Sequence, residues 1–243
     1  MTAAAAACAA AGAARAGDEP ERRVTLPGSR GELAGLYRPA QSGRGRAVLI
    51  VGATGMPIEE TAVIAAPLSE RCCSVLTLQN PAMPKREVSS TGLPILDILS
   101  LGGSSLGQYI PDLEQALKWM ASQQSADTAA PVIAGVGLGA NETAILLGEH
   151  ASPVGGFVFI KPGGSCDTAA VERALKQQKG VPALLVTGSG DEIFRRAFLS
   201  TSDPLRRILD APPAKPDSPA AKEWIPRASD IVDWVHGLPA AGS

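Results

Sequence analysis

The sequence has few aromatic residues and no excess of either charge. Aromatic residues make up 4% of the 243 positions, which argues against a surface on which nucleic-acid bases stack. Lys and Arg number 22 against 24 Asp and Glu, so the formal net charge is -2 and no basic stripe indicates a nucleic-acid partner. No apolar run reaches the roughly 18 residues that a membrane-spanning helix needs. We therefore expect a soluble protein with no nucleic-acid partner and no transmembrane segment.

Metal-binding residue types are also scarce. The chain has two histidines, His150 and His236, and they lie too far apart in the sequence to suggest a zinc site. Its four cysteines form no C-x-x-C motif and no obvious disulfide framework; they are Cys8, Cys72, Cys73 and Cys166. We predict no metal and no cofactor, and the redox state of the cysteines stays open.

The first 17 residues are almost pure alanine and differ from the rest of the chain. Ala14-Arg15-Ala16 before Gly17 fits the small-x-small pattern of a signal cleavage site, which favours an exported protein, periplasmic or secreted. A disordered or organelle-targeting tail is the alternative; without an export signal, the protein would be cytoplasmic. Either way, we predict a leader over residues 1–19 and one domain over residues 20–238.

From residue 22 onward, strand-like and helix-like segments alternate. Expected strands cover residues 22–28, 31–40, 46–53, 74–81, 131–137, 154–160, 181–188 and 222–225. Expected helices cover residues 59–72, 111–123, 140–150, 167–178 and 229–236. Residues 82–108 are rich in Pro, Gly and Ser and are interpreted as a long irregular connection, either a lid or a disordered excursion. The order predicts an α/β fold, a mostly parallel sheet with helices on both faces and an antiparallel hairpin at its N-terminal edge.

In such sheets, ligands bind beyond the carboxyl ends of the strands. The loop after the strand at 131–137 reads Ala-Gly-Val-Gly-Leu-Gly-Ala over residues 134–140. A tight strand-to-helix turn needs small residues two positions before and after its apex, because the chain nearly collides with itself there. Gly135 and Gly139 occupy those two positions, and Gly137 occupies the apex.

With these glycines, the chain resembles the α/β-hydrolase superfamily, whose nucleophile elbow is G-x-S-x-G. Other segments share the resemblance, which spans about residues 23–236. The family's opening hairpin and third strand are similar to VTLPGSRGELAGLYRPA and AVLIVGATG. The helix before the elbow resembles PDLEQALKWM, and the strand and turn that carry the acid resemble VPALLVTGSGDE.

Carried over by position, the resemblance puts the nucleophile at Gly137, which has no side chain, and the acid at Asp191. The base is implied in the loop at 226–229, which has no histidine, and His236 lies about 10 Å further along the following helix at roughly 1.5 Å per residue. Backbone donors of an oxyanion hole are implied at Ala53 and Leu138. Whether the chain is an enzyme therefore stays uncertain. Our hypothesis is a hydrolase-fold protein that has lost the nucleophile and base positions of the triad and is non-catalytic or of very low hydrolase activity. It would act as a binding or accessory protein for a small-molecule or acyl ligand.

Two alternatives stay open. An active ester or acyl hydrolase could use a non-standard nucleophile in a loop, the candidates being Ser104, Ser105, Ser165, Cys166 and Ser189. An NAD(P)-binding Rossmann-like protein could use Gly135, Gly137 and Ala140 as G-x-G-x-x-A, or the glycines of residues 52–55. Asp191 also has a purely structural interpretation, in which it accepts backbone hydrogen bonds within its own turn. The sequence indicates neither substrate nor oligomeric state.

Overall fold

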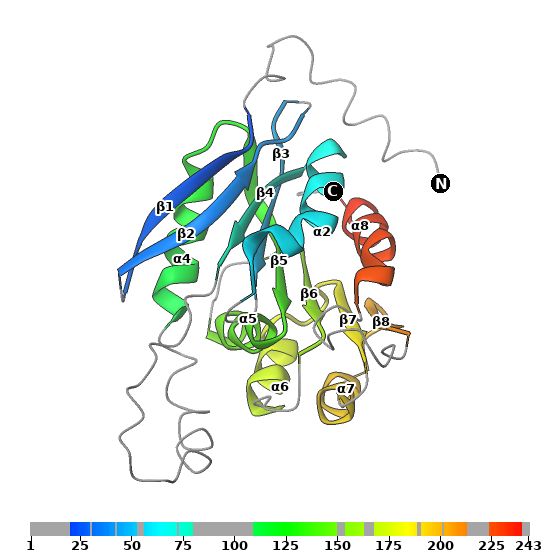
Figure 1. Cartoon of the computed structure of the whole chain (residues 1–243). Helices are drawn as coiled ribbons and strands as arrows, with labels where there is room; N and C mark the ends of the chain where they lie inside the picture. Colours follow the sequence, from blue (N-terminus) through cyan, green and yellow to red (C-terminus); the bar gives the residue numbers. More distant parts are fainter. Residues whose placement is uncertain are drawn as a thin grey trace, which may run out of the picture.

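The computed structural model describes residues 20–29, 31–41, 43–52, 56–71, 73–79, 109–149, 154–162, 168–188, 191–200, 202–212 and 224–239. Within them, eight strands form one sheet in the order β1-β2-β4-β3-β5-β6-β7-β8 (Figure 1). The strands are β1 (Arg22–Gly28), β2 (Gly31–Arg38), β3 (Gly45–Val51), β4 (Cys73–Leu78), β5 (Ala126–Val136), β6 (Gly156–Ile160), β7 (Ala183–Thr187) and β8 (Arg206–Asp210). The predicted leader and the connection at 82–108 lie outside the described residues, so the export prediction and the role of that connection stay predictions.

The sheet is antiparallel only at its N-terminal edge. β1 pairs with β2, and β2 pairs with β4, in antiparallel register. From β4 onward, every neighbouring pair is parallel. The predicted hairpin and mostly parallel sheet are therefore confirmed, and the carboxyl ends of the six parallel strands share one edge of the sheet.

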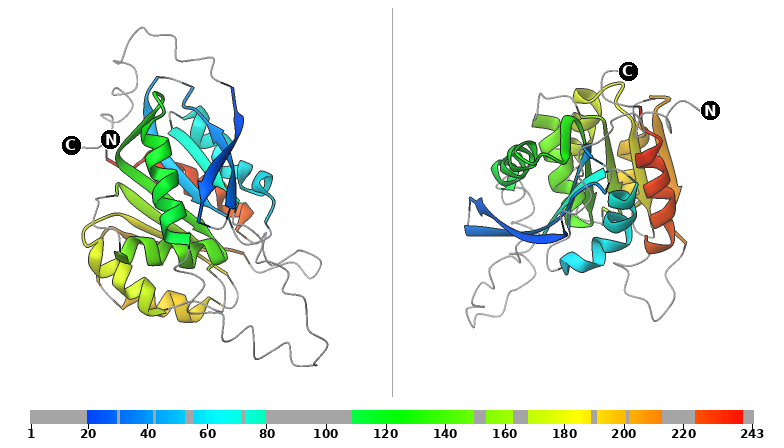
Figure 2. Two further views of the ribbon diagram at one scale, coloured as in Figure 1. Left: turned by 90° about the vertical axis from the view of Figure 1, so that its left-hand side faces the viewer. Right: turned by 90° about the horizontal axis from the view of Figure 1, so that it is seen from above.

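Helices cover both faces of this sheet (Figures 1 and 2). They are α2 (Ala62–Glu70), α4 (Ile110–Ala121), α5 (Leu138–Glu149), α6 (Thr168–Gln177), α7 (Glu192–Leu199) and α8 (Ala228–His236), with short 3-10 turns η1 (Ile58–Thr61) and η4 (Ile225–Arg227). None of the described helices combines the length and the apolar character needed to cross a bilayer.

The core lies in two layers because strand side chains alternate between the faces of the sheet. In β6, Phe157 and Phe159 pack among α4, α5, α6 and α7, whereas Val158 and Ile160 pack among α2 and α8. All five residues of β6 are buried, which explains why this strand is a continuous apolar run. The central strands thus hold the carboxyl edge of the sheet in a fixed position.

In the C-terminal region, the predicted strand at residues 222–225 was wrong, and the elements α7 and β8 were not predicted. Residues 224–225 are not strand: Trp224 is a buried turn residue and Ile225 begins η4. The last strand is instead β8, and α7 precedes it; neither was predicted. β8 has one strand neighbour and carries charges at both ends, so it lacks the apolar run that marks a central strand.

Candidate functional site

The turn between β5 and α5 is a single residue long. β5 ends at Val136, α5 begins at Leu138, and Gly137 between them has a φ of 59°. Its N–H donates to the carbonyl of Ile160 at 2.8 Å, and its own carbonyl accepts from the N–H of Ala140 at 3.0 Å. Left-handed φ is the region that glycine enters without steric cost. The apex is therefore held by backbone contacts alone.

Gly135 and Gly139 allow the chain to approach itself on either side of this apex. A Cβ on Gly135 would lie 2.3 Å from the carbonyl oxygen of Gly139. A Cβ on Gly139 would lie 2.3 Å from the carbonyl oxygen of Val51, at the end of β3. The predicted near-collision is confirmed. Contacts within the chain are thus sufficient to explain both glycines, with no need for a bound pyrophosphate.

The apex is more exposed than the residues around it. Gly137 and Leu138 are half-buried, whereas Val136 and Gly139 are buried. Leu138 is the first residue of α5, so its N–H belongs to the first turn, where helix N–H groups lack intrahelical acceptors. Such N–H groups, together with the helix dipole, attract anionic oxygen. Of the two predicted oxyanion positions, only Leu138 is described; Ala53 lies outside the described residues.

Lys161 lies next to this apex and was not among the predicted site residues. It follows Ile160, whose carbonyl receives the N–H of Gly137, and its own N–H donates to the carbonyl of Val186 at 2.8 Å. Its φ is 48°, which makes it the single non-glycine residue with positive φ among the described residues. Left-handed backbone in such a residue is strained, and strain of this kind clusters at functional sites. The preceding apolar run gives no signal of this conformation.

Asp191, at the predicted acid position, is used within its own turn. It is 2% exposed and directly precedes α7. Its Oδ2 accepts the N–H of Gly188 at 2.7 Å, and its backbone carbonyl accepts the N–H of Arg195 at 2.9 Å. The structural interpretation of Asp191 is confirmed, because its carboxylate holds the turn between β7 and α7. Whether it also has a catalytic role stays a prediction.

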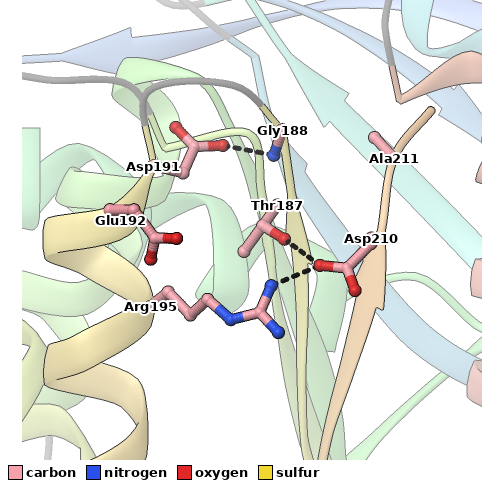
Figure 3. A pocket seen from close by; sticks show the side chains of 7 residues that line it. All are labelled: Thr187, Gly188, Asp191, Glu192, Arg195, Asp210 and Ala211. Atoms are coloured by element: carbon pink, nitrogen blue, oxygen red, sulfur yellow. Dashed lines mark hydrogen bonds and ion pairs between the residues drawn. The ribbon is translucent and has the colours of Figure 1, made fainter. Parts of the chain in front are cut away.

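A small polar cavity of about 90 Å³ lies beside Asp191 (Figure 3). It is lined by Thr187, Gly188, Asp191, Glu192, Arg195, Asp210 and Ala211. These residues come from the ends of β7 and β8 and from the first turn of α7. By the resemblance, Asp191 lies at the acid position, and the loop after the last strand, β8, would carry the base. The cavity lies between Asp191 and β8. None of the described residues that line the cavity is a histidine.

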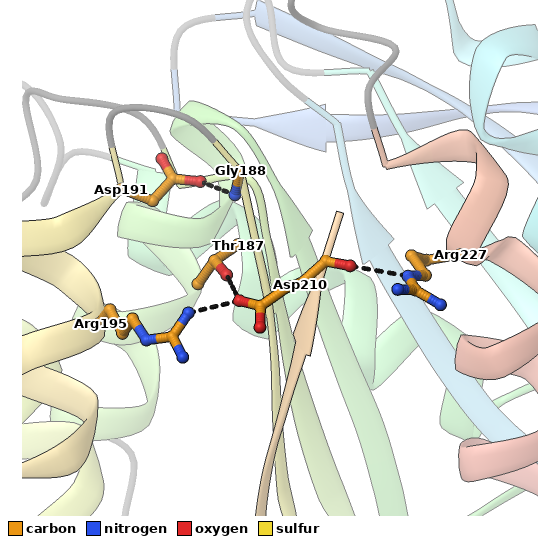
Figure 4. A network of polar contacts seen from close by, with 6 residues as sticks. All are labelled: Thr187, Gly188, Asp191, Arg195, Asp210 and Arg227. Carbon is orange, nitrogen blue, oxygen red and sulfur yellow. Dashed lines mark hydrogen bonds and ion pairs between the residues drawn. The ribbon is translucent and has the colours of Figure 1, made fainter. Parts of the chain in front are cut away.

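Asp210 links four elements around this cavity and was not singled out from the sequence (Figure 4). Its carboxylate accepts from Thr187 Oγ1 at 3.0 Å and pairs with Arg195 of α7. Its backbone carbonyl accepts from Arg227 Nε at 2.8 Å, which brings in η4. The hydrogen bond from Arg195, followed by that from Thr187, lowers the pKa of Asp210. Because Asp210 belongs to the unpredicted strand β8, nothing local could have placed it in this network.

His236 lies near the amino-terminal ends of the parallel strands, whereas the elbow lies at their carboxyl ends. It is the last residue of α8, and the adjacent carbonyls of Val235 and Leu238 both accept from the guanidinium of Arg46 at 3.3 Å. Arg46 lies at the start of β3, whereas the elbow packs on Val51 at its end. Five strand residues at about 3.3 Å each separate the two edges by roughly 16 Å. The expectation that His236 cannot serve the elbow is confirmed.

The loop after β8 is longer than predicted, because β8 ends at Asp210 and η4 begins at Ile225. Its sequence, residues 211–224, contains no histidine. His150 lies outside the described residues, directly after the last residue of α5. The proposed alternative nucleophiles Ser104, Ser105, Ser165, Cys166 and Ser189 also lie outside them. Within the described part of the chain, no group of three His, Cys, Asp or Glu residues could hold a metal ion.

Comparison with known proteins identifies the fold. No protein-family model matches the sequence, and no curated protein matches it significantly. Solved structures do match. DcsB in complex with its substrate analogue covers 91% of this chain and 100% of its own, with 12% identity and a TM-score of 0.66. Dienelactone hydrolase from Anabaena variabilis covers 90% and 99%, with 16% identity and a TM-score of 0.63.

The esterase domain of a Rhodothermus marinus protein is similar to the same extent, covering 90% of this chain and 99% of its own, with 14% identity and a TM-score of 0.60. The fold is that of the α/β-hydrolases. At these identities, the likeness establishes the fold alone and transfers no activity. The predicted fold class is therefore confirmed, and the chemistry has to be argued from the site.

Proposed function

We propose that this α/β-hydrolase-fold protein does not hydrolyse substrates by Ser-His-Asp chemistry and acts as a binding or accessory protein. The observation that carries the proposal is the residue at the apex of the elbow. Gly137 has the backbone conformation of the turn but no atom that can attack a carbonyl. Its immediate neighbours in the turn, Val136 and Leu138, are apolar and cannot replace a nucleophile.

The energetic argument supports the same proposal. In a serine hydrolase, loss of a triad member leaves only about 10³–10⁴-fold acceleration over the reaction in water. Here the nucleophile position is a glycine, and the loop after β8 has no histidine. The carboxylate of Asp191 already accepts a hydrogen bond within its own turn. An acid without a base and a nucleophile to orient has no catalytic task in this chemistry.

The elbow can still bind oxygen-bearing ligands. The first turn of the twelve-residue helix α5 presents its N–H groups at the half-buried apex. Lys161 adds a cationic residue beside the apex. Without a side chain at Gly137, a ligand oxygen can approach the N–H groups of this first turn directly. We therefore propose a carboxylate or an acyl carbonyl as the group that binds here. No observation among the described residues favours the dinucleotide hypothesis or the alternative-nucleophile hypothesis over this proposal.

Restoring the hydroxyl tests whether the nucleophile alone is missing. We expect Gly137→Ser to show no efficient turnover of short-chain activated esters, because no base is present to accept the serine proton. Added imidazole supplies that base from solution, so fluorophosphonate labelling of Gly137→Ser should rise with imidazole concentration. Gly137→Ala is the matched control, since it carries the same left-handed strain of about 1–2 kcal/mol but no hydroxyl.

The wild-type protein gives the decisive comparison. It should neither hydrolyse the esters nor react with the fluorophosphonate, and saturating short-chain carboxylates should raise its melting temperature more than the matched alcohols do. Robust turnover by the wild-type protein, or stoichiometric labelling of one of its serines, would overturn the proposal. Equal effects of carboxylates and alcohols on the melting temperature would exclude the proposed ligand group.

A further inference from the structure

The outer edge of β8 has the backbone groups needed to pair with another strand. Among the described strands, β8 has only β7 as a neighbour. Ala183 N–H donates to the carbonyl of Leu205, and Ala211 N–H donates to the carbonyl of Thr187. Along a parallel strand, successive residues direct their N–H and C=O groups to opposite sides. The groups of residues 205, 207, 209 and 211 therefore point toward β7, and those of residues 206, 208 and 210 point outward.

Ile208 is the central residue of this outer edge. Asp203 already accepts the N–H of Arg206, and Arg227 already donates to the carbonyl of Asp210. For Ile208, no partner of the outward N–H and C=O is found within the described part of the chain. A residue that presents both groups outward can form the doubly hydrogen-bonded pair of an antiparallel ladder with its own equivalent in a second copy.

The charges of β8 are complementary to those of the same strand in reverse. The strand reads Arg-Arg-Ile-Leu-Asp over residues 206–210. Antiparallel pairing centred on Ile208 places Arg206 of one copy directly opposite Asp210 of the other, and the twofold axis repeats this pair. Opposite charges facing each other across an antiparallel pair stabilise it, whereas like charges destabilise it. A self-complementary patch is what a twofold-symmetric interface requires.

Exposed apolar side chains occur in α7 and in the residue before β8. Among the described residues, the large hydrophobic side chains that are exposed are Ile193 at 61%, Leu199 at 60% and Leu205 at 46%. Leu205 directly precedes β8, and the other two belong to α7. The Arg195–Asp210 ion pair and the hydrogen bond from Arg206 to the carbonyl of Phe198 join α7 to β8. Of these residues, Leu205 lies next to the outer edge in the sequence, and exposed apolar surface of this kind favours association.

The other edge of the sheet contrasts with this one. β1 also has a single neighbour, yet it carries Pro27, which has no N–H to donate. It also carries Arg22 and Arg23, and antiparallel pairing of β1 with itself would set no acidic residue opposite either of them. Proline and like charges are common means of keeping an edge strand from pairing. β8 has no proline, and antiparallel pairing of β8 with itself sets Asp210 opposite Arg206.

We propose that this chain forms a homodimer in which β8 pairs antiparallel with β8 of a second copy, centred on Ile208. The pairing extends the eight-stranded sheet across a twofold axis. It is independent of any ligand at the elbow, because β8 and β5 are separated by two strands.

Removal of one N–H tests the backbone pairing. By light scattering after size exclusion, the wild-type protein should be dimeric and Ile208→Pro monomeric. The proline removes an outward N–H at a position where an edge strand tolerates it, and it also shortens a partly buried side chain. Ile208→Val, which keeps the N–H and a β-branched side chain, should remain dimeric. Circular dichroism checks that all variants are folded. A monomeric wild-type protein up to its solubility limit, or a dimer that persists in a folded Ile208→Pro variant, would overturn the proposal.

A charge exchange tests the register and does not depend on proline. In a homodimer of the Arg206→Glu variant, the introduced carboxylate lies opposite Asp210 of the other copy. In a homodimer of the Asp210→Arg variant, the introduced guanidinium lies opposite Arg206 of the other copy. Each variant alone should therefore dimerise at least tenfold more weakly than the wild type. Mixing the two variants restores both opposite-charge pairs, so the mixture should form a heterodimer in which each protomer carries one substitution. A mixture that stays as monomeric as its components, with both components folded, would exclude this register.

Discussion

The elbow and the region around Asp191 lie at the same end of the parallel strands but are held by different kinds of contact. At the elbow, the backbone geometry is complete: Gly137 has left-handed φ, and Gly135 and Gly139 permit close packing of backbone on backbone. Around Asp191, a side chain holds the turn, because its carboxylate accepts the N–H of Gly188. The glycines are needed for the chain to fold whether or not a nucleophile is present. A serine or a histidine is needed only for the chemistry.

Substitution of a packing glycine at the elbow should have the largest effect. A Cβ in Gly139→Ala would lie 2.3 Å from the carbonyl oxygen of Val51, so the end of β3 or the start of α5 must move. We expect a loss of about 3 kcal/mol or more in the free energy of unfolding, measured by urea denaturation. Gly148→Ala in the same helix is the control. There the new Cβ would lie 3.2 Å from Cβ of Arg173, and the change should stay within about 1 kcal/mol.

Equal effects of the two alanine substitutions would contradict this account of the elbow. They would mean that the backbone approach at Gly139 relaxes easily and that the close packing at the elbow contributes little to stability.

Removal of the buried carboxylate should have an intermediate effect. Asp191→Ala leaves the N–H of Gly188 without its acceptor, and a loss of about 1–3 kcal/mol in the free energy of unfolding is expected. Asp191→Asn keeps an acceptor oxygen and should lose less. The measurement is the urea midpoint of both variants beside the wild-type protein. If Asp191→Ala is as stable as the wild type, the carboxylate does not hold the turn, and a separate role for Asp191 regains support.

The smallest effect is expected at Asp210, and it depends on pH. Arg195 and Thr187 lower the pKa of this carboxyl, so its stabilisation is complete above the unfolded pKa of about 3.9 and is lost as pH falls through the native pKa. The Asp210 side chain is 66% exposed and solvent screens its ion pair, so Asp210→Asn should cost only about 0.5 kcal/mol at neutral pH. Urea denaturation between about pH 7 and about pH 2 should show the difference from the wild type vanishing at the acid end. A difference that grows on acidification would contradict the assigned direction.

The parts of the site that could be predicted are those encoded over short distances. The elbow depends on three glycines within five residues, and the antiparallel hairpin depends on two apolar strands around one turn. Asp191 was located because it follows a buried strand. Each of these features is determined by the residue types next to one another in the chain.

The parts that could not be predicted arise from contacts between distant segments. β8 is a short edge strand with charged ends, and only its pairing with β7 makes it a strand. The Asp210 network joins residues that are up to 23 positions apart. Trp224 and Ile225 look like part of a strand but are built into a turn and a 3-10 helix, because burial of Trp224 against the α2 and α8 layer outweighs local propensity. The left-handed backbone of Lys161 likewise depends on its pairing with the end of β7.

The guanidinium of Arg46 has a consequence for the order in which the protein can be completed. It donates to the carbonyls of Val235, Leu238 and Pro239, which are 189 to 193 positions later in the chain. Burial lowers the pKa of this arginine, so water does not fully replace those acceptors. Val235 and Leu238 follow Arg46 by 189 and 192 positions, so water must solvate this guanidinium until both residues have been synthesised. The start of β3 and the end of α8 therefore reach their native contacts together, late in the formation of the domain.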